Sequence, residues 1–203
     1  MKDSDKIIFH LCADIGSDSQ PYRDKPDEYE VICIGRQVGV ENYHPPENVY
    51  GVIANPPCTN FSIARTNAKT PRDMREGTRL VQECLRIIWE CQYYMVAKHV
   101  PHKLSFWVIE NPATGYLKHY LGKPVFEYCP SDFGEDYTKR TALWGYFNAP
   151  KKPIWFANKL KGRCLLNDLT PITSRHNVDP IERMNERSKV SPKSAQMFFE
   201  ANR

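Results

Sequence analysis

Four short, continuous apolar runs constrain the fold of this chain more than any other feature. Each is hydrophobic almost throughout, without the polar and apolar alternation of a sheet that has one face in water. Such runs are typical of strands buried on both faces, as in a parallel sheet covered by helices. The four runs are Ile7–Cys12, Val31–Ile34, Val49–Ala54 and Leu104–Ile109.

The best helix signal lies between the third and fourth runs. We expect Thr70 as its N-cap, Pro71 at its first helical position and Asp73 in its first turn. Because a strand, a helix and another strand predict a right-handed crossover, we expect an α/β, Rossmann-like fold with a mainly parallel sheet and helices on both faces. The helix should pack on the sheet through Leu80, Cys84, Ile87, Ile88, Cys91 and Met95.

The length of 203 residues favours a single domain. No abrupt change of composition argues for a second one. We expect an α/β core over residues 1–147, an irregular region over 148–190 and a C-terminal helix over 191–203, with Pro192 at its start.

Composition narrows the classes of protein to consider. Seven cysteines without a Cys-x-x-Cys pair do not suggest a disulfide framework or a zinc site, so we expect no metal and a reducing cytoplasm. A net charge of +4 permits a nucleic-acid partner without requiring one. No apolar run is long enough to span a membrane, and the polar start Met1–Lys6 does not resemble a secretory signal.

Polar loops follow all four apolar runs. They are Ala13–Ser19, Gly35–Arg36, Asn55–Ser62 and Glu110–Pro112. Since ligands of parallel sheets bind outside the carboxyl ends of the strands, we expect these loops to line one cleft.

Two residues of these loops are candidates for chemistry. Pro56 and Pro57 end a strand and stiffen the loop that carries Cys58, whose thiol should be partly exposed and could be activated by Arg65. Glu110 ends a buried strand, where an unpartnered carboxyl costs desolvation free energy. A thiolate can add to an electron-poor ring carbon while a protonated carboxyl hydrogen-bonds the ring nitrogen.

Three segments, in this order, resemble motifs of the DNA (cytosine-5) methyltransferases. Pro56–Ser62 is similar to their Pro-Cys loop, Glu110–Pro112 to their Glu-Asn-Val motif, and Asp132–Gly145 to their arginine-bearing motif. From Ile7 to Arg203 the chain follows the order of that catalytic domain, and it most resembles compact, phage-type members. The resemblance implies an S-adenosylmethionine-dependent methyltransferase fold and, if the chain is phage-encoded, the host cytoplasm as its location.

The resemblance also implies roles for individual residues. Cys58 would attack carbon 6 of cytosine, Glu110 would hold the edge that bears nitrogen 3, and Arg140 would help to grip the base or its phosphate. Carbon 5 would then take a methyl group from S-adenosylmethionine, on a base that has left the duplex stack or is presented single-stranded. The substrate-binding residues would be Asn60, Phe61, Ser62, Arg65, Asn111 and Pro112.

The implied cofactor site departs from the family pattern at two points. Asp14 stands where the first glycine of the cofactor loop is expected, and Gly35 with Arg36 follows the second strand where an acid should bind the ribose. An arginine there favours an anionic group, so a carboxylated S-adenosylmethionine or a folate is an alternative donor; otherwise Asp14 or Glu41 could bind the ribose. The implied cofactor-binding residues are Cys12, Ala13, Asp14, Ile15, Gly16, Ser17, Gly35, Arg36, Asn55 and Pro56.

Substrate recognition stays open, because there is no room for a large target-recognition domain between Arg140 and the C-terminal helix. Lys151, Lys152, Trp155 and the basic loop after Cys58 could make minimal contacts to DNA, a partner chain could supply recognition, or the substrate could be a nucleotide.

Two rival interpretations remain. Asn55–Pro57 also resembles the motif of amino-methyltransferases, although Cys58 stands in place of its aromatic residue. The altered cofactor loop would also suit a binding or decoy protein of a restriction or anti-restriction system that has lost its donor.

Overall fold

The computed structural model describes residues 6–13, 15–46, 48–63, 69–97, 104–135, 137–153 and 188–203, without the side chains of residues 94–97. The predictions for Asp14, Arg65 and Trp155, for the packing of Met95 and for most of the 148–190 region lie outside this part of the chain.

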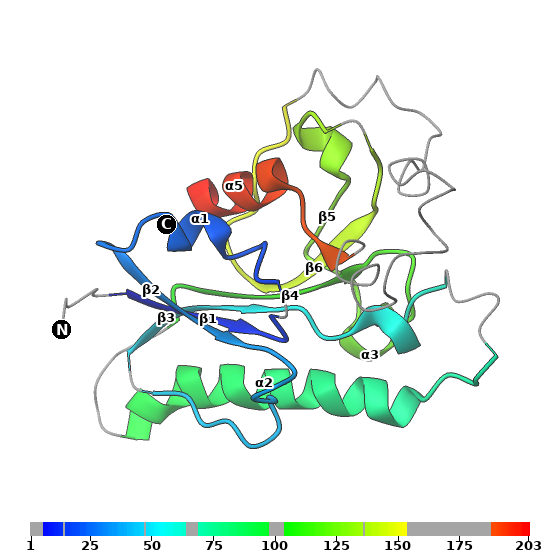
Figure 1. The fold of residues 1–203 in the computed structure, drawn as a ribbon, viewed down its shortest axis with the longest axis horizontal. Helices are drawn as coiled ribbons and strands as arrows, with labels where there is room; N and C mark the ends of the chain where they lie inside the picture. The colour runs from blue at the N-terminus through cyan, green and yellow to red at the C-terminus, as the bar shows by residue number, and fades with distance from the viewer. Residues whose placement is uncertain are drawn as a thin grey trace.

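Six strands form one mixed sheet in the order β2-β1-β3-β4-β6-β5 (Figure 1). The four strands predicted from the apolar runs are confirmed and run parallel to one another, whereas β6 is antiparallel to its neighbours β4 and β5. The last two strands were not predicted. Their bounds are β1 (Lys6–Leu11), β2 (Tyr29–Ile34), β3 (Val49–Ala54), β4 (Phe106–Pro112), β5 (Phe126–Tyr128) and β6 (Thr141–Tyr146).

β4 extends further than its apolar run predicts. Glu110, Asn111 and Pro112, expected in a loop, pair with Leu143, Ala142 and Thr141 of β6. The reason is the antiparallel partner, which continues the ladder past the last apolar residue of β4. The acid of the predicted motif is therefore held within a strand.

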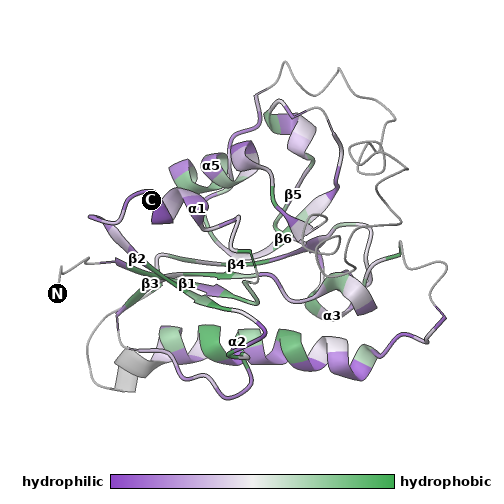
Figure 2. Cartoon of the chain, in the orientation of Figure 1, coloured by the Kyte–Doolittle hydropathy of each residue, from purple (hydrophilic) through white to green (hydrophobic). Residues whose placement is uncertain are grey.

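The helix α2 (Met74–Ala97) covers one face of the sheet (Figures 1 and 2). Its predicted apolar stripe is largely buried, and Cys84 and Ile87 are completely inaccessible. The predicted start of this helix is wrong: it begins at Met74, after both Thr70 and Pro71. Asp73, expected in the first turn, is the N-cap, because its Oδ1 accepts a hydrogen bond from Glu76 N at 2.9 Å. Aspartate caps a helix as well as threonine does, and Asp73 lies closer to the first turn.

The opposite face is covered by α1 (Gln20–Arg23) and α5 (Pro192–Ala201) (Figure 1). The predicted C-terminal helix is confirmed, with Ser191 as its N-cap and Pro192 in its first turn. Tyr22 and Phe199 meet edge to face with ring centroids 4.8 Å apart, which joins the two helices in one aromatic cluster. Helices on both faces are thus confirmed.

Three short elements complete the described part: η1 (Cys58–Asn60), α3 (Lys118–Leu121) and η2 (Pro130–Phe133). None of the helices in the described ranges combines the length and the apolar character needed to cross a bilayer.

Candidate functional site

The carboxyl ends of β1, β3 and β4 lie side by side, as the parallel register requires. Leu11 pairs with Ala54, and Ala54 pairs with Ile109. Just beyond this point, Asn55 N donates to Leu11 O at 3.0 Å. Polar side chains from these strand ends meet on the face that α5 covers.

Asn55 is the centre of this polar group. Its Nδ2 donates to Asp18 Oδ2 at 2.7 Å and to Glu110 Oε2 at 3.2 Å. Its Oδ1 lies 2.7 Å from His10 Nε2, and His10 Nδ1 lies 2.8 Å from Ser19 Oγ. One amide therefore joins a histidine to two carboxyl groups.

The two carboxyl groups determine, through Asn55, which ring nitrogen of His10 carries the hydrogen. Because the Asn55 amide nitrogen faces two acceptors, its oxygen must accept a hydrogen from His10 Nε2. His10 Nδ1 then accepts from the Ser19 hydroxyl. Burial lowers the pKa of His10 to about 4, so the ring is neutral at physiological pH.

Glu110 has a strongly perturbed carboxyl group. Burial raises its pKa to about 7; the nearby Lys139 opposes this shift, and the negative charge of Asp18 adds to it. Its Oε1 is buried and has no hydrogen-bond partner among the described residues. Glu110 can therefore hold a proton near neutral pH, and its Oε1 is available for one more hydrogen bond.

Asp18 is the second carboxyl group of the site. It accepts hydrogen bonds from Asn55 at 2.7 Å and from Ser17 Oγ at 3.2 Å. Burial raises its pKa as well, while these hydrogen bonds and Lys139 act in the opposite direction. Asp18 and Glu110 thus form an acid pair bridged by Asn55.

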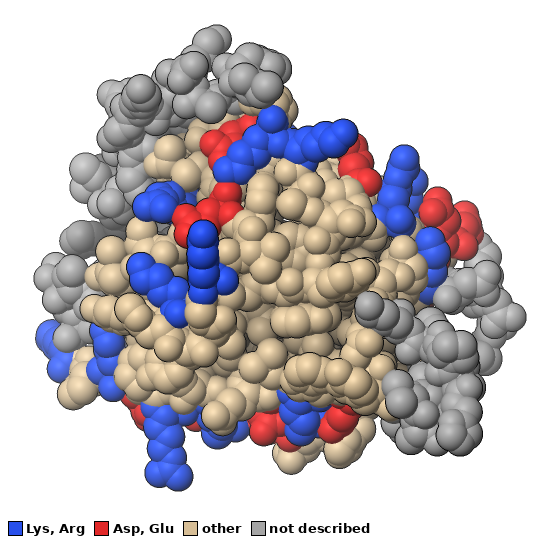
Figure 3. Space-filling view, turned by 180° about the vertical axis from the view of Figure 1, so that it is seen from behind, with Lys and Arg blue, Asp and Glu red and all other residues tan. Residues whose placement is uncertain are grey.

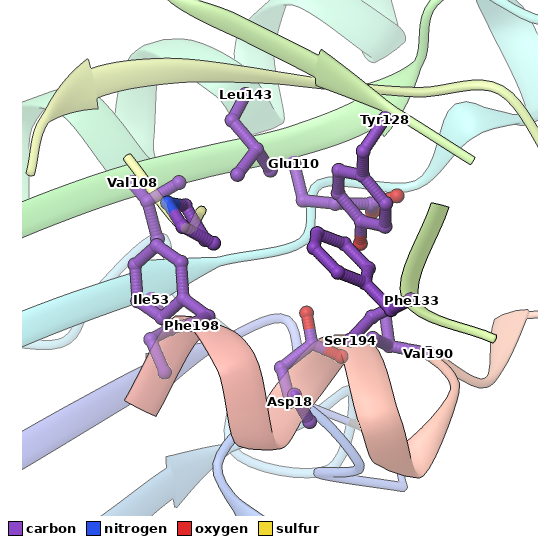
Figure 4. Close-up of a pocket in the computed structure, with 12 residues that line it drawn as sticks. Asp18, Ile53, Val108, Glu110, Tyr128, Phe133, Leu143, Val190, Ser194 and Phe198 are labelled. Atoms are coloured by element: carbon purple, nitrogen blue, oxygen red, sulfur yellow. The ribbon is translucent and has the colours of Figure 1, made fainter. Parts of the chain in front are cut away.

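The acid pair borders a narrow cavity between the sheet and α5 (Figure 4). Tyr128 and Ser194 contribute further polar groups, and Tyr128 lies beside Glu110. The cavity volume of about 30 Å³ has room for about two water molecules. Because Glu110 Oε1 is itself buried, a pyrimidine ring must displace part of the cavity wall to reach it. The remaining walls are mostly apolar: Ile53, Val108, Phe133, Leu143, Pro150, Val190, Ala195 and Phe198.

The loop that carries Cys58 is exposed and firmly anchored. Phe61 N and Ser62 N both donate to Cys58 O, at 2.9 and 2.7 Å, which closes the turn of η1. Asn111 Nδ2 donates to Pro56 O at 2.8 Å, and so ties the loop to β4 next to Glu110. The thiol side chain is exposed, as predicted.

Several predicted substrate-binding residues have structural contacts. Phe61 is completely buried in the core and Asn111 is 1% exposed, so both anchor the Cys58 loop from within. Asn60 Oδ1 accepts from Asp73 N at 3.1 Å, and Pro112 pairs with Thr141. Ser62 is half-buried on the same loop.

Arg140 forms an ion pair with Glu127 and not with either carboxyl group of the acid pair. Its guanidinium group is exposed and lies 2.8 Å from Glu127 Oε2. The neighbouring Lys139 is the cation that acts on Glu110 and Asp18, and its Nζ donates to Ser188 O at 3.4 Å. In this conformation the charge opposite the acids comes from Lys139.

The predicted cofactor loop passes close to α1. Gly16 has φ +69°, and a Cβ there would lie 2.9 Å from the Arg23 guanidinium, which also hydrogen-bonds Gly16 O. Ser17 Oγ accepts from Val190 N at 3.0 Å. Arg23 therefore fills the space beside Gly16. Cys12, at φ +56°, places its sulfur 3.8 Å from that of Cys84 on α2; Ala13 is buried and Ile15 half-buried.

The end of β2 joins the same edge. Ala13 N donates to Ile34 O at 3.0 Å, and Gly35 O accepts from Gly39 N, which turns the chain away. Arg36 is exposed on this turn. Glu41, the alternative ribose ligand, lies 2.9 Å from Arg79 in an ion pair.

The basic side chains on the face seen in Figure 3 do not form a continuous patch of the kind that binds nucleic acid. On the face seen in Figure 3, Lys and Arg side chains are dispersed around a broad uncharged area. Lys151 is exposed, but Lys152 Nζ lies 2.8 Å from Asp132 Oδ2.

Sequence reasoning found Asn55 and Glu110 but missed His10, Asp18 and Lys139. His10 carried a signal, because it is a polar residue inside an apolar run. Asp18 and Lys139 carried none, since they are polar residues in polar segments.

No protein-family model matches the chain, and a search of curated proteins finds no match. Among the residues that the structure describes, no group of three His, Cys, Asp or Glu side chains could hold a metal ion.

Proposed function

We propose that this protein modifies carbon 5 of cytosine through a covalent bond to Cys58, with transfer of a methyl group as the first candidate reaction. The observation that carries the proposal is a buried Glu110 carboxyl, whose pKa burial raises to about 7, on the strand beside a loop that exposes a cysteine. The hydrogen bond from Asn111 to Pro56 joins these two parts.

The residues have complementary tasks in this reaction. Cys58 Sγ, as a thiolate, forms a bond to carbon 6 as the double bond between carbons 5 and 6 breaks, and Glu110 gives its proton to nitrogen 3 and becomes a carboxylate. Protonation of nitrogen 3 makes carbon 6 more electrophilic, and the displaced electron pair makes carbon 5 nucleophilic. A bound S-adenosylmethionine would supply the methyl group to carbon 5. Loss of the carbon 5 proton to a base, expulsion of Cys58 as a thiolate and return of the nitrogen 3 proton to Glu110 then restore the ring.

The donor site is the less defined half of the proposal. The ends of β1 and β2 offer backbone groups at Cys12, Gly16 and Gly35, together with the guanidinium groups of Arg23 and Arg36. These groups suit an anionic portion of a donor better than ribose hydroxyls. S-adenosylmethionine remains the first candidate, and a carboxylated S-adenosylmethionine or a folate is the alternative.

An oligonucleotide containing 5-fluorocytosine tests the proposal. Its carbon 5 carries fluorine in place of the hydrogen that the base must remove, so the covalent intermediate with Cys58 cannot break down. We expect a covalent adduct, measured by mass spectrometry, that requires the donor. The adduct should be absent in Cys58→Ser and kept in the matched control Cys33→Ser. If neither DNA nor deoxycytidine nucleotides give an adduct with any of the three donors, the proposal is refuted.

A binding protein without a donor is the second candidate. It is favoured by Arg23, which fills the space beside Gly16 where a donor would approach the loop. Calorimetry separates the two candidates. If the protein is a binding protein, no donor should bind to it, whereas nucleic acid that contains cytosine should bind.

A further inference from the structure

Asp18, the second member of the acid pair bridged by Asn55, has no part in the reaction steps proposed above. Two carboxyl groups accept from the same amide nitrogen, at 2.7 Å for Asp18 and 3.2 Å for Glu110. Two negative charges this close and this buried repel each other strongly, so such a pair holds one proton over part of the pH range.

Hydrogen bonds indicate which carboxyl group holds that proton. Asp18 accepts from two donors, Asn55 and Ser17, and has the shorter bond to the shared amide. Glu110 accepts only the longer bond, and its Oε1 is buried without a partner among the described residues. Since a carboxylate needs donors and a carboxylic acid carries its own, the charge belongs on Asp18 and the proton on Glu110 Oε1.

We propose that Asp18 is a positioning residue for Glu110: it holds the negative charge of the pair and thereby keeps a proton on Glu110 Oε1, where the ring nitrogen of a pyrimidine receives it. The pairing itself rests on geometry alone, whereas its use in catalysis rests on the proposed function.

The other groups around Glu110 are consistent with this assignment. His10, from β1, is neutral and supports Asn55. Tyr128, from β5, is uncharged because burial and the two acids raise its pKa. Lys139, which precedes β6, lowers the pKa of both acids. The residues with which α5 lines the cavity, Ser194, Ala195 and Phe198, are uncharged. The unequal hydrogen bonds therefore distinguish the two carboxyl groups.

The test is a titration of both carboxyl carbons by ¹³C NMR in protein labelled at Glu Cδ and Asp Cγ. Glu110→Gln and Asp18→Asn identify the two signals by their loss. In the unsubstituted protein we expect Asp18 to lose its proton at a lower pH than Glu110. The opposite order overturns the proposal, and because it is read in the unsubstituted protein, the variants serve only to identify the signals.

The variant Asp18→Asn removes the charge and keeps an oxygen that can accept from Asn55. We expect the pKa of Glu110 to fall by about one pH unit or more, which lowers its protonated fraction at pH 7 about fivefold. Asp24→Asn, which removes an equal charge from the exposed end of α1, should leave the titration unchanged. An unchanged Glu110 titration in Asp18→Asn overturns the proposal.

This titration needs no substrate, so its outcome is independent of whether an adduct forms. If an adduct forms, its yield in Asp18→Asn should decline at a lower pH on the alkaline side than in the unsubstituted protein. A decline at the same pH overturns the catalytic part and leaves the pairing intact.

Discussion

Replacing Glu110 with glutamine should change the dependence of stability on pH by a predictable amount. The native protein raises the pKa of Glu110 from 4.5 to about 7, mainly through burial. Between these values the folded state keeps a proton that the unfolded state has lost. Because the folded state then binds more protons, the free energy of unfolding decreases as pH rises through this window.

The magnitude follows from the size of the shift. About 2.5 pH units at about 1.4 kcal/mol per unit give a loss of about 3 kcal/mol between pH 4.5 and pH 8. A glutamine side chain has the size of a protonated glutamic acid and can accept the Asn55 hydrogen bond, but it cannot ionise. We therefore expect Glu110→Gln to be close to the unsubstituted protein in stability at pH 4.5 and about 3 kcal/mol more stable at pH 8.

The measurement is urea denaturation of both proteins at pH 4.5, 6 and 8, followed by circular dichroism. Glu200→Gln removes a carboxyl group from the exposed side of α5 and should show no such divergence. A difference between Glu110→Gln and the unsubstituted protein that stays constant from pH 4.5 to pH 8 would refute the reasoning. It would mean that Glu110 is as well solvated in the folded chain as in the unfolded one.

Three further predictions concern packing and the Cys58 loop. Gly51→Ala should lower the free energy of unfolding by about 2 to 3 kcal/mol, since its Cβ would lie 2.4 Å from the Phe106 ring. Gly122→Ala meets no atom within 4 Å, but φ +78° and ψ −163° lie in a region open essentially to glycine alone, so it should cost about 1 to 3 kcal/mol through backbone strain; thermal unfolding measures both costs, and an unchanged stability in either variant would contradict its stated cause. Asn202→Ala should cost about 2 kcal/mol by urea denaturation, because this buried side chain accepts from Asn148 N at 2.8 Å and donates to Asn148 O at 3.0 Å; a cost below about 0.5 kcal/mol would contradict the tie. Asn111→Ala should slow formation of the 5-fluorocytosine adduct at least tenfold and leave the circular dichroism spectrum unchanged, since it frees Pro56 from β4; an unchanged adduct rate would show that this tie does not position Cys58.

The parallel half of the sheet was predictable because burial on both faces leaves a direct trace in the sequence. Val49–Ala54 was predicted with the bounds that the structure shows. β5 and β6 were missed because their strands are short or include polar residues, and their pairing depends on a long-range antiparallel contact. The same contact explains why β4 continues through Glu110, which local propensity places in a loop.

The candidate site was predictable in part for a similar reason. Residues at the ends of parallel strands must share one edge, so Asn55 and Glu110 could be placed together from the sequence. The shared edge does not show, however, on which face of the sheet these side chains lie. Asp18 is a loop residue, so no strand register predicts its position. Its contact with Asn55 depends on how the Ala13–Ser19 loop enters α1.

The choice of face explains how the site is assembled. In a strand, residues two apart lie on the same side, so Ile53 and Asn55 share a side, as do Val108 and Glu110. Ile53 and Val108 pack in the cluster beneath α5, and His10 pairs with Ile53 in the register of β1 and β3. His10, Asn55 and Glu110 are therefore the polar continuation of the apolar face that α5 covers. Since that face excludes water, it raises the pKa of Glu110 and lowers that of His10, and the packing that stabilises the fold also sets the protonation of the site.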